Sequence, residues 1–391
     1  MLAHHVLIAG AGIGGLTAAL ALHRRGVKVT VLEQAESIAA VGAGLTLWPN
    51  ALHALDMLGL SGALASRGRP ILEASIRVSN GFLLQRSQPG EMADRYGFAP
   101  LAIHRAALHE SLMEALPRDV VRLGQRVTRY DQDERGVRVM LESGDTVEGD
   151  LLIGADGLGS VTRQQLRPDI VPRYAGHPAW RGVAPASAAP DLTESVEAWG
   201  CGPRFGMVPL VEEIYWFATA LLPEGRALAP TQHHAELIDR YGKWYAPIPD
   251  LIAATPPESI LYHDVYDIPP FRGWSDGRVT LLGDAVHATT PNMGQGACMA
   301  IESAVVLAEP LGERSLVSRT GRIDQDTGSP WPELLTYLGV DDGFLPPVVA
   351  AGTPLGEVTA PWAPSAFAGA RLTVAGHDHL VAALAGGAGP D

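Results

Sequence analysis

Cysteine is scarce in this sequence, with only Cys201 and Cys298 among 391 residues. Neither belongs to a Cys-x-x-Cys pair, which argues against a dithiol–disulfide reductase. Two cysteines also make a disulfide framework improbable, so we expect a reducing, cytoplasmic location. Metal-binding patterns are missing too. The nearest approach, His377-Asp378-His379, has no third ligand at helical spacing, and no metal is expected.

Positive charge and long apolar runs are also in short supply. Lysine and arginine number 29 against 43 acidic residues, for a formal charge of -14, so neither a nucleic acid nor an anionic lipid surface is an expected partner. The longest candidate span, residues 6–22, contains several glycines and is shorter than the roughly 20 residues that a membrane helix needs. Arg24 and Arg25 follow it, unlike a signal peptide. No membrane span is predicted.

A glycine-rich turn between two apolar runs stands near the N-terminus. The pattern predicts a strand at His5–Ala9, a helix from Leu16 to Arg25 and a second strand at Lys28–Leu32. Glycines in such a turn let backbone N–H groups approach a pyrophosphate at a helix N-terminus. The glycines concerned are Gly10, Gly12, Gly14 and Gly15.

An acid closes the second strand of this unit. Glu33 follows Gly15 by eighteen residues, close to the roughly 20 expected of the acid that binds a ribose hydroxyl. The motif alone does not separate FAD from NAD, but a carboxylate disfavours the 2′-phosphate of NADP. No second glycine fingerprint occurs near mid-chain, which favours a monooxygenase over a pyridine-nucleotide disulfide reductase.

Two further apolar runs end in an acid. One leads to Asp156-Gly157 and the other to Gly283-Asp284. An acid at the carboxyl end of a strand is well placed to accept bonds from ribose or ribityl hydroxyls. The turn from Pro291 to Gly296 then precedes a predicted helix over 297–307. Its N–H groups can point at the N1–O2 edge of a flavin, where charge collects on reduction.

The three fingerprints, in order and spacing, resemble those of the aromatic-ring hydroxylases, the single-component flavin monooxygenases. Within them the sequence is most similar to the subgroup of urate hydroxylase, salicylate hydroxylase and zeaxanthin epoxidase, over residues 1–310. The resemblance implies that Asp284 holds a ribityl hydroxyl of FAD and that the Asp156 motif serves both FAD and NAD(P)H. It further implies cofactor contacts at Glu33, Gln34, Thr46, Arg105, Val127, Pro291, Gly294, Gly296, Ala297 and Cys298.

This resemblance also implies a reaction. NAD(P)H reduces FAD, O2 adds to the reduced flavin, and the resulting hydroperoxide hydroxylates a small aromatic or heteroaromatic substrate, with no side chain acting as nucleophile or metal ligand. Two alternatives stay open: an uncoupled NAD(P)H oxidase, and a flavin-binding protein that is catalytically impaired.

The substrate region is expected at residues 172–275, where Arg204–Pro209 and Ile214–Thr219 look like neighbouring strands. Similarity to urate hydroxylase implies that Arg204 and Tyr215 contact substrate, and Trp216 is a further candidate. The plainer alternatives are sheet core for the two aromatic residues and a solvated surface charge for Arg204. Asn292 stands where urate hydroxylase has an acid that pairs with the arginine, so Arg204 is expected to face an anionic substrate.

The expected fold is α/β: a Rossmann-like FAD-binding domain in residues 1–171 and 276–311, an inserted mixed-sheet substrate domain in 172–275, and an unrelated C-terminal segment, 312–391. From about residue 315 the sequence resembles a fragment of the sugar-kinase family of xylulokinase and glycerol kinase. Asp378 matches the catalytic aspartate of those kinases. The family's phosphate loop and nucleotide domain are missing, so no kinase activity is expected.

Overall fold

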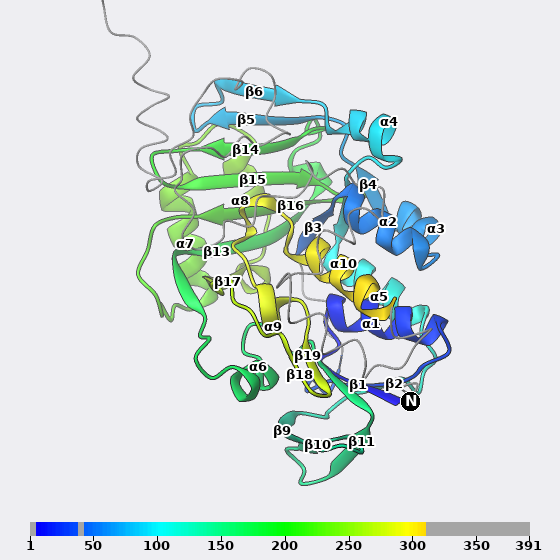
Figure 1. The fold of residues 1–391 in the computed structure, drawn as a ribbon. Helices are drawn as coiled ribbons and strands as arrows, with labels where there is room; N and C mark the ends of the chain where they lie inside the picture. The colour runs from blue at the N-terminus through cyan, green and yellow to red at the C-terminus, as the bar shows by residue number, and fades with distance from the viewer. Residues whose placement is uncertain (1–4, 38–42, 310–391) are drawn as a thin grey trace, which may run out of the picture.

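The computed structural model describes residues 5–37 and 43–309. The segment 312–391, with the kinase-like stretch and His377–His379, lies outside the described residues. The described part contains two large sheets, joined by a smaller sheet and a set of helices (Figure 1).

The first sheet has six strands in the order β18-β19-β12-β1-β2-β8, parallel except for β18. Its central strands are continuous apolar runs because helices and the small β9–β11 sheet cover its faces. Side chains of β1 and β2 form one core with helices α1 (Ile13–Arg24), α2 (Pro49–Met57), α5 (Arg105–Glu114) and α10 (Gly296–Ala308). The strands are β1 (His5–Ala9), β2 (Lys28–Leu32), β8 (Val121–Arg122), β12 (Leu151–Gly154), β18 (Ser275–Asp276) and β19 (Val279–Leu281).

The second sheet has seven strands in the order β17-β13-β16-β15-β14-β5-β6. It is mixed, because β14 pairs with β5 in parallel and its other pairs are antiparallel. The strands are β5 (Ala74–Val78), β6 (Leu83–Ser87), β13 (Arg173–Pro185), β14 (Ser195–Trp199), β15 (Arg204–Pro209), β16 (Glu213–Thr219) and β17 (Leu261–Asp267). Strands β5 and β6 lie within residues 1–171, so the expected division needs a correction: this sheet is not built from one continuous insertion.

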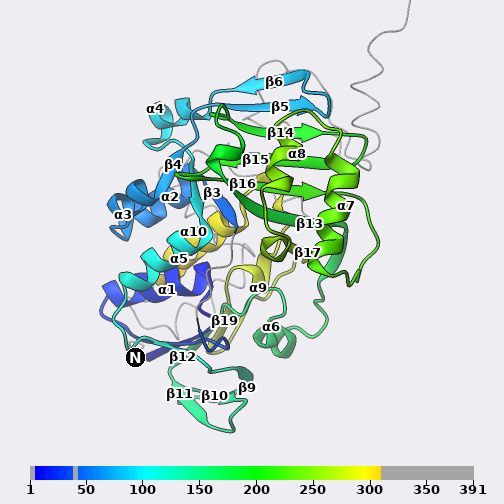
Figure 2. The same ribbon diagram turned by 180° about the vertical axis from the view of Figure 1, so that it is seen from behind.

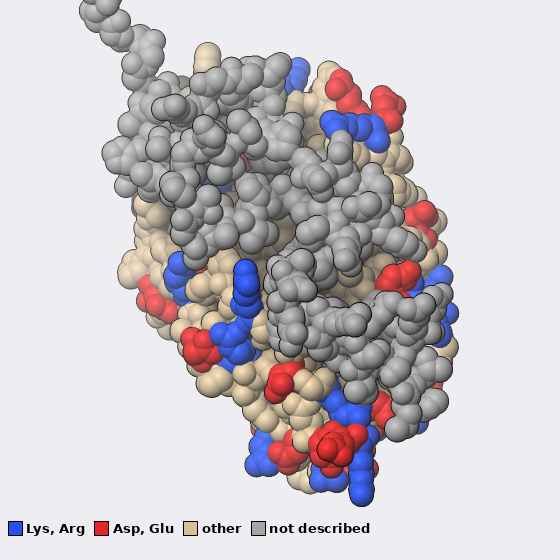
Figure 3. All heavy atoms as spheres, in the orientation of Figure 1, with Lys and Arg blue, Asp and Glu red and all other residues tan. Residues whose placement is uncertain are grey.

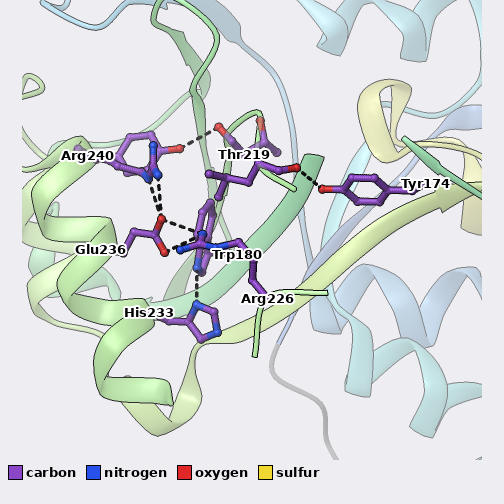
Figure 4. A network of polar contacts seen from close by, with 9 residues as sticks. Tyr174, Trp180, Thr219, Arg226, His233, Glu236 and Arg240 are labelled. Carbon is purple, nitrogen blue, oxygen red and sulfur yellow. Dashed lines mark hydrogen bonds and ion pairs between the residues drawn. The ribbon is translucent and has the colours of Figure 1, made fainter. Parts of the chain in front are cut away.

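The two faces of the seven-stranded sheet have different neighbours. Helices α7 (Pro230–Tyr241) and α8 (Ile248–Ala253) cover the outer face (Figure 2). Trp180, Phe205 and Trp216 form a core with them there. A polar network reinforces this contact (Figure 4): the indole of Trp180 donates to His233 Nδ1 over 3.1 Å, and Glu236 accepts from two arginines. The opposite face, called the inner face below, carries Tyr215 and packs on Ala43 and Ala102.

A three-stranded sheet, β3 (Gly44–Leu47), β7 (Leu101–His104) and β4 (Gly68–Pro70), lies beside the inner face. Another, β9 (Val127–Gln132), β10 (Val137–Leu141) and β11 (Thr146–Gly149), stands at one end of the molecule, where acidic and basic side chains intermingle (Figure 3). The remaining helices are α3 (Ser61–Arg67), α4 (Met92–Tyr96), α6 (Val161–Leu166) and α9 (Asp284–His287). Among the described helices, none is long and apolar enough to cross a membrane.

Candidate cofactor and substrate site

The glycine-rich turn joins β1 to α1 and has no room for side chains on its inner side. Gly10 has a φ of +100°, and a Cβ there would stand 2.4 Å from the Ala155 oxygen. A Cβ at Gly15 would come within 2.1 Å of the Gly10 oxygen. At Gly12, by contrast, a Cβ would meet nothing within 4 Å. Backbone at Gly12 is therefore open to close approach by a ligand such as a pyrophosphate.

Glu33 stands directly beside this turn, as its spacing predicts. Its carboxylate accepts from the Ala11 N–H at 2.7 Å and from the Ala35 N–H at 2.9 Å. Gln34 follows and accepts a hydrogen bond from Arg126. The Gln125 N–H donates to the Glu33 carbonyl at 2.7 Å, which brings the segment leading to Val127 to the same edge of the sheet.

Asp284 begins α9 at the carboxyl end of β19 and is exposed. Its carboxylate makes no hydrogen bond or ion pair within residues 5–37 and 43–309. Arg105 begins α5, where its N–H donates to the Ala43 carbonyl at 2.8 Å. Although Arg105 is exposed, desolvation by the protein around its guanidinium lowers its pKa, and the charge of Asp284 opposes that effect. The two opposite charges therefore lie near each other, with the carboxylate free to bind a ligand hydroxyl.

Asp156 is used differently. One carboxylate oxygen accepts from Ser160 Oγ at 2.5 Å, and the other accepts from both the N–H and the Oγ1 of Thr162 at 3.0 Å. These bonds close the loop ahead of α6. Arg163, which is fully buried, extends the loop by donating to the Leu158 and Ala285 carbonyls. The Asp156 motif thus contacts the Asp284 helix through Arg163.

The turn ahead of α10 contains a short 3-10 helix, Pro291–Met293, and Gly294 with a φ of +62°. Helix α10 then begins at Gly296, followed by Ala297 and Cys298. N–H groups in the first turn of a helix have no intrahelical acceptor and carry partial positive charge. This end of α10 can therefore bind an anionic edge of a ligand.

Cys298 joins this helix to the end of β3. Its thiol donates weakly to the Thr46 carbonyl at 3.6 Å and accepts from the Trp48 N–H at 3.4 Å. Burial raises the pKa of the Cys298 thiol to about 12, so the thiol stays protonated at neutral pH. These bonds hold the end of β3, with Thr46, against the start of α10, with Cys298. Both segments are predicted to contact the cofactor.

Arg204 and Tyr215 share the inner face of the seven-stranded sheet, whereas Trp216 does not. The Tyr215 ring lies against Gly44, where a Cβ would be 2.5 Å from the ring. Trp216 points to the outer face, stacks on Phe205 and donates to Thr255 Oγ1 at 2.9 Å. Adjacent residues of a strand face opposite sides, so Trp216 belongs to the core alternative and not to the substrate side.

Arg204 is not the unpaired cation that the sequence led us to expect. Its guanidinium donates to Glu197 Oε1 at 3.1 Å and to Asn292 Oδ1 at 2.8 Å. Glu197 lies on the neighbouring strand β14 and supplies the carboxylate that position 292 lacks. Asn292 still connects the arginine to the turn ahead of α10, but the charge of Arg204 is balanced within the sheet.

The family described as "FAD binding domain" matches residues 3–315. The chain belongs to this family. It is 42% identical over 307 residues to the aurachin C monooxygenase/isomerase of Stigmatella aurantiaca, covering 78% of this chain and 80% of that protein. It is 36% identical over 309 residues to the FAD-dependent urate hydroxylase of Klebsiella pneumoniae, covering 77% and 79%. The crystal structure of Klebsiella pneumoniae HpxO complexed with FAD and uric acid superposes with a TM-score of 0.77 at 33% identity, covering 81% of this chain and 82% of that one.

The described residues fit FAD, the cofactor of this family. Gly12 leaves open backbone beside a helix N-terminus, Asp284 offers an unused carboxylate, and the start of α10 offers unused N–H groups. Together they supply contacts for a pyrophosphate, a polyol and an anionic ring edge.

Asn50, Glu302 and Glu197 are candidates that the sequence analysis did not single out. Asn50 Nδ2 donates to Glu302 Oε2 at 2.7 Å and to Gln295 Oε1 at 3.2 Å, which ties the turn ahead of α10 to α2. Burial raises the pKa of Glu302 to about 7. A single acid inside the apolar pattern of the 297–307 helix was a signal that could have found it. The pairing of Glu197 with Arg204 left no such signal, because it depends on strand register.

Proposed function

We propose that this chain is an FAD-dependent monooxygenase that uses NAD(P)H and O2 to hydroxylate a small aromatic or heteroaromatic ring. The observation that carries the proposal is that the three fingerprints, Gly10–Gly15, Asp156 and Asp284, follow the ends of the adjacent parallel strands β1, β12 and β19. The turn ahead of α10 comes next in the chain and is hydrogen-bonded through Asn292 to Arg204 on the inner face of the second sheet. Membership of the family and the names of its relatives, which include hydroxylases of urate and of 3-hydroxybenzoate, support the same reaction type.

Bound FAD, once reduced by NAD(P)H, supplies the oxygen-activating chemistry. The chain's own residues would bind the cofactor and the substrate and orient them toward each other. Glu33 and the glycine turn would hold the adenosine and pyrophosphate end, while Asp284 and Arg105 would hold the ribityl and phosphate region. The N–H groups in the first turn of α10 would stabilise negative charge on the cofactor, and they are already oriented for this by the helix.

The inner face would hold the substrate ring. Tyr215 is buried there, and Phe217 lies beside it with ring centroids 6.3 Å apart. Arg204, linked to Asn292, would connect the substrate side with the turn ahead of α10. Apolar and aromatic side chains at this face would exclude water from the substrate ring and from the side of the site that faces the cofactor. Residues 1–171 and 276–311 would bind the cofactor, and 172–275 together with 74–87 would cover the substrate.

The test is a set of three measurements on the full chain. The visible spectrum of the purified protein should show flavin bands, and denaturation should release FAD. NADH and NADPH consumption should then rise when 3-hydroxybenzoate, salicylate or urate is added, with a hydroxylated product detected by mass spectrometry. Release of hydrogen peroxide in place of product for every ring would identify an uncoupled oxidase and count against the proposal. Absence of flavin would refute it.

A further inference from the structure

The inner face carries a second arginine besides Arg204. Arg181 lies on β13, paired in register with Phe217 on one side and Leu261 on the other. Its neighbour Trp180 is fully buried on the outer face, so strand alternation places Arg181 on the inner face. Arg181 itself is only partly buried.

The two arginines differ in how their charge is balanced. Arg204 is bound by Glu197 and Asn292. Arg181 has no hydrogen bond or ion pair from its side chain to any described residue. The described residues give Arg181 no carboxylate partner, and the planar set of donors of a guanidinium matches a carboxylate or phenolate oxygen. Arg181 is therefore the better placed of the two to receive an anion.

The surroundings of Arg181 place it between the cofactor side and the substrate side. Its charge contributes to the pKa values of Arg105, Tyr215 and His263, in each case after burial as the main cause. Arg105 also feels Asp284, the acid at the start of α9. Tyr215 packs on Gly44 of β3. Arg181 thus lies within electrostatic range of both the proposed flavin contacts and the proposed substrate contacts.

Two like charges, Arg105 and Arg181, act on each other in this region, and Asp284 is the acid that acts on Arg105. Repulsion between two arginines favours the binding of an anion in this region. Arg105 and the glycine turn would take the phosphates of FAD. Arg181 lies between Phe217 and Leu261 in the second sheet and would face the substrate ring. The apolar neighbours of Arg181 suit an aromatic ring that bears one anionic oxygen.

We propose that Arg181 binds the anionic oxygen of the substrate, a carboxylate or phenolate on the aromatic ring, and so selects anionic rings over neutral ones. This inference rests on the proposed function and names the substrate class of that same site. Arg204, with its charge balanced by Glu197, orients the ring or the turn ahead of α10 and contributes less to charge selection.

The experiment uses the FAD-loaded full chain and two matched probes, 3-hydroxybenzoate, which is anionic, and 3-hydroxybenzamide, which is neutral. Binding is followed by the change in flavin absorption on titration. Wild-type protein should bind the anion at least about tenfold more tightly, which is the scale of one charge-assisted hydrogen bond. Arg181→Met should weaken binding of the anion roughly 10- to 100-fold while changing binding of the amide by less than about threefold. Arg181→Lys should restore part of the preference.

The matched control is Arg173→Met, which removes an arginine from the same strand that is exposed and paired with Asp267. It should leave the affinity for both probes unchanged. FAD content and the melting temperature of each variant show whether it folds and carries cofactor.

Either of two binding results would overturn the inference: equal affinity of wild type for the two probes, or an Arg181→Met variant that keeps the anion preference. Loss of FAD from folded Arg181→Met would also overturn it, because it would show that the arginine serves the cofactor. Failure of the proposed function has a separate signature. In that case no ring, charged or neutral, would stimulate NAD(P)H consumption or yield hydroxylated product, whatever the binding titrations show.

Discussion

Asp156 and Asp284 follow the carboxyl ends of two neighbouring parallel strands, β12 and β19, yet the fold uses them in opposite ways. Asp156 accepts three hydrogen bonds from Ser160 and Thr162, so its oxygens are occupied within its own loop. Asp284 is exposed, and its carboxylate has no hydrogen-bond partner among the described residues. The first acid therefore builds the loop, and the second remains available to a ligand.

The difference shows that an acid at a strand end is not by itself a ligand site. The hydrogen-bonding capacity that remains after folding decides the role of each carboxylate. The same principle separates Arg204, whose charge is balanced by Glu197, from Arg181, whose charge is not balanced within the described chain.

The largest expected effect is that of Asp284→Ala on cofactor binding. Removal of an unused carboxylate should weaken FAD binding roughly 10- to 100-fold, since a charge-assisted hydrogen bond contributes about 1.5–3 kcal/mol. The stability of the apoprotein should change little, because the Asp284 carboxylate makes no hydrogen bond or ion pair with the part of the chain that the structure describes. Fluorescence titration of apoprotein with FAD measures the first effect, and urea unfolding the second. Unchanged FAD affinity would remove Asp284 from the site.

A third acid, Glu302, differs from both Asp156 and Asp284 because it is buried. Its carboxyl group accepts a hydrogen bond from Asn50. Burial raises the pKa of Glu302 to about 7, above its value in an unfolded chain. The stability that comes from the bound proton is complete below about pH 4.5 and is lost as pH rises to about 7. Glu302→Gln does not titrate, so between pH 5.5 and 8 its unfolding free energy should rise relative to wild type by about 2 kcal/mol. Parallel urea-unfolding curves check this, and a pH-independent difference would contradict the raised pKa.

Asp156→Ala should have effects opposite to those of Asp284→Ala: a loss of stability in the apoprotein and little change in FAD affinity. Loss of the bonds to Ser160 and Thr162 should lower the unfolding free energy of the apoprotein by about 1–2 kcal/mol, as for other loop and helix-start carboxylates. FAD affinity per folded molecule should fall by less than about threefold. Urea unfolding and FAD titration on the same sample separate the two quantities. A large loss of FAD affinity without destabilisation would mean that Asp156 also binds the cofactor.

The smallest effect is expected at Glu197, whose ion pair with Arg204 is partly exposed. Glu197→Gln keeps the shape of the side chain and removes its charge, which leaves Arg204 unbalanced. Binding of 3-hydroxybenzoate should then tighten about two- to threefold, since partly exposed ion pairs contribute up to about 1 kcal/mol. The neutral amide is the control and should bind as before. Weaker binding of the anion would show that the ion pair with Glu197 positions Arg204 for contact with the substrate.

Much of the cofactor unit could be predicted from the sequence, because its signals are local. The strands His5–Ala9 and Lys28–Leu32 have the predicted bounds, and the helix predicted over 297–307 is α10, Gly296–Ala308. Continuous apolar runs, a glycine turn and an acid at a fixed spacing each arise from neighbouring residues. The neighbouring strands containing Arg204 and Tyr215 were predictable for the same reason.

Only the tertiary structure decided which of the predicted side chains remain available to bind a ligand. Tyr215 and Trp216 must face opposite sides of their strand, but the packing of α7 and α8 decides that Trp216 is core. Strand register decides that Glu197 neutralises Arg204, and β5 joins the second sheet from about 120 residues earlier in the chain. These are contacts between segments far apart in sequence. Local patterns carry no information on them, because the partner of each polar group is fixed only when the sheets assemble.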